Sequence, residues 1–208
     1  MARQPTLEFW YEFASSYSYL AAMRIEAAAE AAGVAVRWRP FLVGPLFASQ
    51  GWTTSPFNLY PAKGKNMWRD VEREAARLGL PPLTRPAQFP QNSLSAVRAA
   101  IYGHDQDWLV PFSKAVFTAS FAEGRSIAEP AAVVEILDSL GLDGTQTVRA
   151  AAGEANKTRL RVAVEEARSR GIYGAPTFLA DYGELFWGND RLEQALAWAV
   201  GDRPAGIR

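Results

Sequence analysis

The chain contains 208 residues, of which 49% are hydrophobic and 21% are charged, and its formal net charge is zero. These proportions are typical of a globular protein with one sizeable domain, or of a domain with a large insertion. The balanced charge gives no indication of a nucleic-acid partner or of an anionic membrane surface.

Two rare residue types limit the chemistry that the chain can perform. It has no cysteine, which excludes disulfides, thiolate metal sites and any thiol chemistry of its own. It has a single histidine, His104, so a histidine metal cluster is excluded. We interpret His104 as structural. The N-terminal residues lack the apolar run of a signal peptide, and no stretch approaches the ~20 apolar residues that cross a membrane. We therefore expect a cytoplasmic protein without a metal centre.

The first two elements meet at a short polar corner. Residues 7–13 are rich in aromatic side chains and predict a buried strand. From Ser16, apolar residues recur at three- and four-residue steps, which predicts a helix that ends at Gly33. The corner at Ser15 therefore exposes unpaired N–H groups and the positive end of a helix dipole, which stabilise an anion. A serine here can also simply cap the helix.

The middle of the chain is predicted to be mostly helical. Residues 34–42 alternate in polarity and predict a second strand, which makes a parallel βαβ unit with the first. The five glycines and prolines of residues 43–61 predict a long loop, and its aromatic residues indicate a functional role. Helical spacing then predicts helices over 63–78, 92–101, 108–121, 130–140, 145–152 and 154–170.

The strand pattern returns only near the C-terminus. Residues 176–180 and 184–187 are short apolar runs joined by a turn, which predicts a hairpin, and residues 189–200 predict a final helix. This order resembles the thioredoxin fold, an α/β arrangement with a four-stranded mixed sheet and a large all-helical insertion. We expect a discontinuous thioredoxin-like domain of residues 1–45 and 171–208, interrupted by a helical domain of residues 46–170.

Three motifs support a closer resemblance. Residues 13–20 read Phe-Ala-Ser-Ser-Tyr-Ser-Tyr-Leu, residues 174–177 read Gly-Ala-Pro-Thr, and residues 187–192 read Trp-Gly-Asn-Asp-Arg-Leu. In this order, around a helical insertion, they resemble 2-hydroxychromene-2-carboxylate isomerases and the related kappa-class glutathione transferases. These families belong to the DsbA-like group of thioredoxin folds, and the likeness covers nearly the whole chain.

The resemblance implies a binding site for glutathione. Family members hold the cofactor sulfur with a serine at the position of Ser15. Pro176 matches a proline that follows a cis peptide bond, so that the Ala175 backbone can pair with a peptide ligand. Asn189 and Asp190 match a polar pair that holds the γ-glutamyl end of glutathione. The simpler alternatives are a trans proline that opens a strand and two residues that cap the last helix.

The resemblance also implies a substrate side of the site. The isomerases place a lysine at the position of Lys63, facing the substrate carboxylate and phenolate, although most lysines are solvated surface residues. We expect Trp52, Phe57 and Tyr60 to form an aromatic substrate pocket. The chain departs from the family at Ser16, where a proline is common, and at Trp52, near a usual asparagine.

The resemblance therefore implies a glutathione-dependent isomerase, with Ser15 and Lys63 as catalytic residues and a small aromatic molecule as substrate. A homodimer is possible, since homodimers are common in the family. Two alternatives stay open. One is a kappa-like glutathione transferase or peroxidase that acts on other electrophiles, and the other is a redox-inactive thioredoxin-like binding module.

Overall fold

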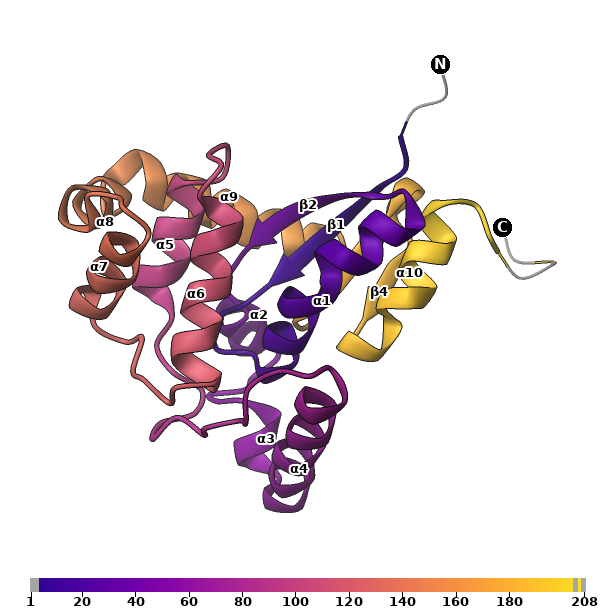
Figure 1. Ribbon diagram of the computed structural model, residues 1–208, viewed down its shortest axis with the longest axis horizontal. Coiled ribbons are helices and arrows are strands. Elements are labelled where there is room, and N and C mark those ends of the chain that lie inside the picture. Colours follow the sequence, from indigo (N-terminus) through magenta and orange to yellow (C-terminus); the bar gives the residue numbers. More distant parts are fainter. Residues whose placement is uncertain (1–3, 204–205, 207–208) are drawn as a thin grey trace.

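The computed structural model of the protein describes residues 4–203 and residue 206, apart from the side chain of Tyr182. These residues form a mixed four-stranded sheet in the order β2-β1-β3-β4, with helices packed around it (Figure 1). The strands are β1 (Thr6–Tyr11), β2 (Ala35–Pro40), β3 (Thr177–Ala180) and β4 (Leu185–Trp187). β2 pairs parallel to β1, whereas β3 is antiparallel to both β1 and β4. The predicted fold class is confirmed.

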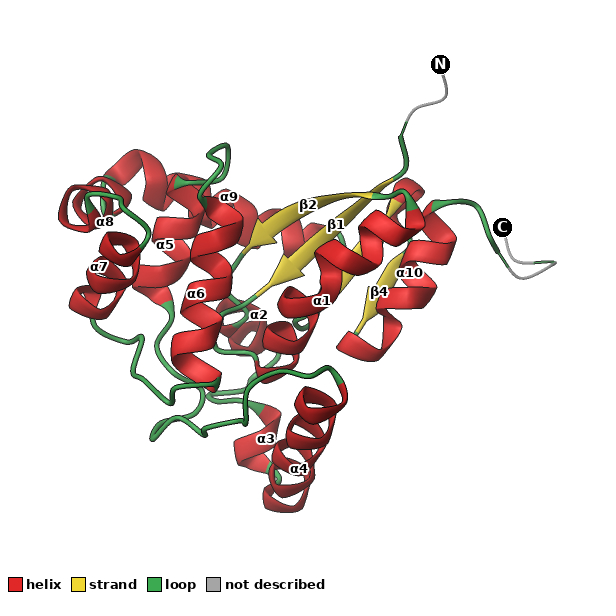
Figure 2. Ribbon diagram, viewed as in Figure 1, coloured by secondary structure: helices red, strands yellow, loops and turns green. Residues whose placement is uncertain are grey.

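The helices account for most of the remaining chain (Figure 2). In order they are α1 (Ser16–Ala32), α2 (Gly44–Ser49), α3 (Pro56–Leu59), α4 (Pro61–Arg77), α5 (Leu94–Tyr102), α6 (Leu109–Phe121), α7 (Pro130–Ser139), α8 (Gly144–Ala151), α9 (Glu154–Ser169) and α10 (Leu192–Ala199). Between β2 and β3 the chain is thus helical, as the sequence predicts. In Figure 1, α5–α8 lie on one side of the sheet, and α3 and α4 lie apart from them.

The central strand β1 supplies side chains to both faces of the sheet, because successive residues of a strand point to opposite sides. Leu7, Phe9 and Tyr11 are fully buried in the larger core cluster, together with residues of α1, α6 and α10. Trp10 points to the other face and belongs to a smaller cluster with Leu46 of α2 and Ala167 of α9. The sheet is therefore covered by helices on both faces.

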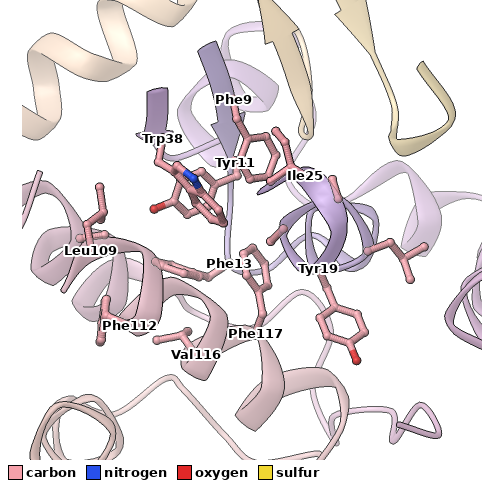
Figure 3. Packing of buried hydrophobic residues seen from close by; sticks show 14 of the residues in the cluster. Phe9, Tyr11, Phe13, Tyr19, Ile25, Trp38, Leu109, Phe112, Val116 and Phe117 are labelled. Carbon is pink, nitrogen blue, oxygen red and sulfur yellow. The ribbon is translucent and has the colours of Figure 1, made fainter. Parts of the chain in front are cut away.

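The larger core joins the sheet to the inserted helices through aromatic rings (Figure 3). Phe13, just after β1, contacts Phe117 of α6 at a ring separation of 5.1 Å, and Tyr11 meets the Phe13 ring edge-on at 5.4 Å. One buried cluster thus contains residues of both predicted domains. The division into a domain of residues 1–45 and 171–208 and a helical domain of residues 46–170 stays a prediction.

The prediction of a long loop over residues 43–61 is wrong in part. This segment contains α2 and α3, and α4 begins at Pro61, two residues earlier than predicted. Pro45 and Pro56 lie in the first turns of α2 and α3, and Pro61 opens α4. Proline is well tolerated in a first helical turn, where its missing N–H has no helical partner. The prolines that we interpreted as helix breakers therefore begin three helices.

The C-terminal prediction is confirmed with one difference. The turn between β3 and β4 is a 3₁₀ turn, η1 (Asp181–Gly183), and the last helix begins with a second 3₁₀ turn, η2 (Asn189–Arg191). α10 follows η2 directly, so the polar pair of residues 189 and 190 lies in a tighter turn than the α-helix that we expected.

Candidate active site

A cleft of about 2240 Å³ opens where β1 leads into α1. It brings together eight of the nine residues that the sequence singles out, namely Ser15, Trp52, Phe57, Lys63, Ala175, Pro176, Asn189 and Asp190. The ninth, Tyr60, is 59% exposed and does not line this cleft. The cleft is therefore the candidate active site, and its two sides come from distant parts of the chain.

The Ser15 hydroxyl forms two hydrogen bonds, one within the cap of α1 and one to the segment beside Pro176. Ser15 is the N-cap of α1, where its Oγ accepts from the Ser18 N–H at 3.1 Å, and it also donates to the Ala175 carbonyl at 2.9 Å. The capping interpretation is thus confirmed, and the same hydroxyl reaches the segment beside Pro176. Among the described residues, no acceptor faces the N–H groups of Ser16 and Tyr17. These two donors remain open at the positive end of the helix.

The peptide bond between Ala175 and Pro176 is cis, as the resemblance to the thioredoxin-like families implies. The segment is held on both sides, because the Pro176 carbonyl accepts from the Gly188 N–H at 3.0 Å. Gly174 allows Trp187 to approach closely, since a Cβ there would lie 2.6 Å from the indole nitrogen. The Ala175 N–H has no acceptor within the described part of the chain.

The polar pair that precedes α10 does not cap the helix. Asn189 is 4% exposed, and its side-chain oxygen accepts from the Arg24 Nε at 2.9 Å. Asp190 is 72% exposed and forms an ion pair with Arg191 at 3.3 Å. Among the described residues, neither side chain accepts a hydrogen bond from a helix N–H. Both groups line the cleft.

Glu12 is a buried carboxyl group just before the corner, and our sequence analysis did not single it out. It is 5% exposed and accepts from the Val43 N–H at 3.1 Å, from the Ala14 N–H at 3.3 Å and from the Ser93 hydroxyl at 2.5 Å. Burial raises the pKa of Glu12, although these hydrogen bonds oppose the shift. No ion pair of Glu12 is present in the described part of the chain.

Aromatic rings and a lysine form the opposite side of the cleft, between residues 43 and 66. Trp52 packs against Phe47 at a ring separation of 5.4 Å, and Phe57 lies 6.3 Å from the Tyr17 ring. The Lys63 ammonium lies 5.7 Å from the centre of the Phe57 ring, and the lysine is exposed. This side therefore combines an apolar surface with an accessible positive charge.

Tyr17 and Asp70 connect the two sides. The Tyr17 hydroxyl donates to Asp70 at 2.9 Å, and Asp70 also pairs with Arg73 rather than with its neighbour Arg69. Residues i and i+3 share a helix face, which allows Asp70 to pair with Arg73 and Arg69 to pair with Glu72. Burial, followed by the Asp70 carboxylate, raises the pKa of Tyr17, which stays protonated and donates.

Comparison with known proteins identifies the family and the fold. Residues 6–197 match the family model described as DSBA-like thioredoxin domain. The chain belongs to this family. It is 30% identical to a 2-hydroxychromene-2-carboxylate isomerase of Sphingobium xenophagum, over 90% of this chain and 94% of that protein. It is 23% identical to the glutathione S-transferase kappa 1 of Caenorhabditis elegans, over 92% and 89% of the two chains.

A solved structure of a 2-hydroxychromene-2-carboxylate isomerase superposes on this DSBA-like chain with a TM-score of 0.83. It is 25% identical and covers 94% of each chain. The resemblance that the three motifs indicate is confirmed at the level of the family. The chain is similar to isomerases and to a kappa-class transferase.

Two kinds of feature are absent from the described part of this DSBA-like domain. The described residues contain no group of three or more histidine, aspartate or glutamate side chains that could hold a metal ion. Within residues 4–203, none of the helices is both long and apolar enough to cross a membrane.

Proposed function

We propose that this chain is a glutathione-dependent isomerase that converts 2-hydroxychromene-2-carboxylate-type substrates to trans-o-hydroxybenzylidenepyruvate-type products. The observation that carries this proposal is the corner at Ser15, which opens two N–H donors beside cis-Pro176 in a chain without cysteine. A chain with this site and no thiol must take its sulfur nucleophile from a small molecule. The similarity to named isomerases supports the same conclusion.

The residues of the cleft fit glutathione. The free Ala175 N–H and the Ala175 carbonyl can pair with the cysteinyl backbone of a peptide as an added strand. Asp190 presents an exposed carboxylate that can accept hydrogen bonds from an ammonium group. The open N–H groups of Ser16 and Tyr17 suit the negative charge of a sulfur atom. When bound, glutathione supplies a nucleophile whose reversible addition to a conjugated carbon permits rotation about a former double bond.

Ser15 changes its partner in this proposal. In the ligand-free chain its hydroxyl proton is directed to the Ala175 carbonyl. A peptide N–H that pairs with this carbonyl competes for the same lone pairs and releases the hydroxyl. The released hydroxyl then donates to the cofactor sulfur, and together with the helix N-terminus it lowers the pKa of a bound thiol. Binding of the peptide backbone thus prepares the donor for the thiolate.

Lys63 and the aromatic side hold the substrate. The exposed ammonium of Lys63 stabilises the carboxylate and the developing phenolate of the substrate. Phe57 and Trp52 provide apolar surface for a bicyclic aromatic molecule. We place Tyr60 at the outer rim, because its ring is exposed.

The test is an absorbance assay of purified protein with a hydroxychromene carboxylate, with and without glutathione. We expect isomerisation that requires glutathione and leaves its concentration unchanged. Stoichiometric loss of glutathione with an electrophilic aryl halide, and no isomerisation, would instead favour a kappa-like transferase. Glutathione binding without turnover of either substrate would favour a binding module. Isomerisation at the same rate without glutathione would contradict the proposal.

A further inference from the structure

Arg24 of α1 reaches the turn before α10 and binds Asn189 of that turn through a fork of two hydrogen bonds. Its Nε donates to the Asn189 side-chain oxygen at 2.9 Å, and its Nη2 donates to the Asn189 carbonyl at 2.5 Å. On its other side the guanidinium forms an ion pair with Glu193. The Arg24 side chain is 13% exposed, so this fork lies mostly out of solvent.

The fork decides which way the Asn189 amide faces. A guanidinium has only donors, whereas an asparagine amide has an oxygen that accepts and a nitrogen that donates. Asn189 must therefore turn its oxygen toward Arg24, which turns its NH₂ group away from Arg24. This NH₂ group has no partner among the described residues, although Asn189 is 4% exposed and lines the cleft. It remains as an oriented, nearly buried pair of donors.

Arg24 itself is already engaged. A guanidinium has five N–H donors, and Arg24 uses four of them in hydrogen bonds to Asn189 and Glu193. Although partial burial alone would raise the pKa of Glu193, the hydrogen bonds from Arg24 lower it, so the carboxylate stays charged and compensates the guanidinium. Arg24 is thus a support for Asn189 and not a free cation in the cleft.

We propose that Arg24 is a positioning residue, which fixes the Asn189 amide with its donors toward the cleft and so makes the site selective for a ligand with a free α-carboxylate. With the Asp190 carboxylate next to it, Asn189 forms a complementary pair for a zwitterionic amino-acid end. The donors of Asn189 meet the carboxylate, and the acceptors of Asp190 meet the ammonium. This inference rests on the proposed use of glutathione and assigns the selectivity for its γ-glutamyl end.

The experiment compares two ligands by calorimetric titration: glutathione, and its analogue in which the α-carboxylate of the γ-glutamyl residue is a primary amide. A hydrogen bond to a charged group is stronger than one to a neutral group, so the wild-type chain is expected to prefer glutathione about tenfold. Arg24→Met keeps the length of the side chain and removes its donors. It is expected to weaken glutathione binding about tenfold and to bring the preference close to one.

Asn189→Asp provides the sharper test. An aspartate keeps an oxygen for Arg24 and presents a second oxygen to the cleft in place of the NH₂ group. The preference is therefore expected to invert, so that the amide analogue binds more tightly than glutathione. This variant keeps the Arg24 contact and remains informative if Arg24→Met does not fold. Arg125→Met is the matched control, because it removes an arginine paired with Glu135 outside the cleft, and it is expected to leave both affinities unchanged.

A double variant separates positioning from direct contact. In the Asn189→Ala background, Arg24→Met is expected to cause no further loss of glutathione affinity. A further loss there, an equal effect of Arg24→Met on both ligands, or an unchanged preference in Asn189→Asp would overturn the positioning role. Failure of the wild-type chain to bind either ligand would instead contradict the proposed function itself.

Discussion

The two sides of the cleft differ in how their side chains are held. On the side of α1 and α10, Ser15 and Asn189 are tied to other elements by hydrogen bonds. On the side of residues 43–66, the Phe57 and Trp52 side chains are held by ring and apolar contacts, and Lys63 is exposed. One side is a polar surface held by hydrogen bonds, and the other is an apolar surface held by ring contacts.

This difference matches two kinds of ligand. Hydrogen bonds are directional, so a surface of oriented donors and acceptors suits a molecule that is the same in every turnover. Aromatic contacts have no such strict geometry and tolerate ligands of varied shape. We therefore assign the polar side to glutathione and the aromatic side to the substrate, and the variants below test each side separately.

Ser15→Ala is expected to have the largest effect. Loss of one donor at a pre-organised anion site typically lowers turnover about 100- to 1000-fold, whereas glutathione affinity should change much less. Stability should fall by about 1 kcal/mol, because the variant also loses the N-cap of α1. Ser18→Ala is the control in steady-state kinetics, since the buried Ser18 hydroxyl has no partner among the described residues. Near-full glutathione-dependent activity in folded Ser15→Ala would contradict the role of the hydroxyl.

Asp190→Ala tests the far end of the polar side. A hydrogen bond to a charged group contributes about 1.5–3 kcal/mol, so glutathione should bind roughly 10- to 100-fold more weakly. The melting temperature should not change, because Asp190 does not cap the helix and its ion pair with Arg191 is exposed. Titration calorimetry beside a melting curve measures both quantities. A lower melting temperature with an unchanged dissociation constant would exclude Asp190 from the site.

Lys63→Met tests the aromatic side. It removes the ammonium and keeps an apolar chain against Phe57. The loss in kcat/KM for a carboxylate substrate should be about fivefold to tenfold, since solvent and salt screen an exposed charge. Glutathione affinity should stay the same. Lys65→Met is the matched control, because Lys65 is exposed on the same helix and does not line the cleft. Equal effects of the two variants would show that Lys63 has no special role.

Glu12→Gln tests the joint between the two sides, where one carboxyl group contacts Ala14, Val43 and Ser93. A glutamine has one acceptor oxygen, so it leaves a backbone N–H unpaired at a cost of about 1–2 kcal/mol. Burial raises the pKa of Glu12 above its ordinary value of 4.5. The folded chain therefore holds the Glu12 proton more tightly than the unfolded chain does. This contribution to the free energy of unfolding is complete below pH 4.5 and is lost as pH rises through the raised pKa.

The measurement is the free energy of unfolding of both chains across this pH range. The stability advantage of the wild-type chain over Glu12→Gln should shrink as pH rises, because glutamine does not titrate. Other carboxyl groups, such as Glu72 and Glu154 with their lowered pKa values, are present in both chains. Their contributions therefore cancel in the difference between the two free energies of unfolding. An advantage that stays constant with pH would show that Glu12 does not titrate in this range.

The fold could be predicted because its signals are local. The aromatic strand before Ser15, the helix that ends at Gly33 and the hairpin around residues 181–183 each have a pattern within a few residues. α2 and α3 were missed because a proline in a first helical turn cannot be distinguished by composition from a helix breaker.

The support of the site could not be predicted, because it depends on contacts between distant residues. Arg24 and Asn189 are 165 positions apart, and Glu12 and Ser93 are 81 positions apart. In the sequence Arg24 is one polar residue in an alanine-rich helix. The only local signal for Glu12 is an acidic residue between two aromatic ones at the end of a buried strand. The motifs indicate the groups that line the cleft but not the groups behind them.

The pairing of β3 with β1 has a consequence for biosynthesis. The side of the cleft that we assign to glutathione consists of Ser15 near one end of the chain and residues 175–190 near the other, and β3 brings them together. A nascent chain that has emerged only as far as α9 contains the corner without Ala175, Pro176 and Asn189. Under the proposed function, a ligand of this site stabilises only chains whose last strands have joined the sheet, because a ligand stabilises the state that binds it. On this proposal, binding of the cofactor favours the completely folded chain over the nascent one.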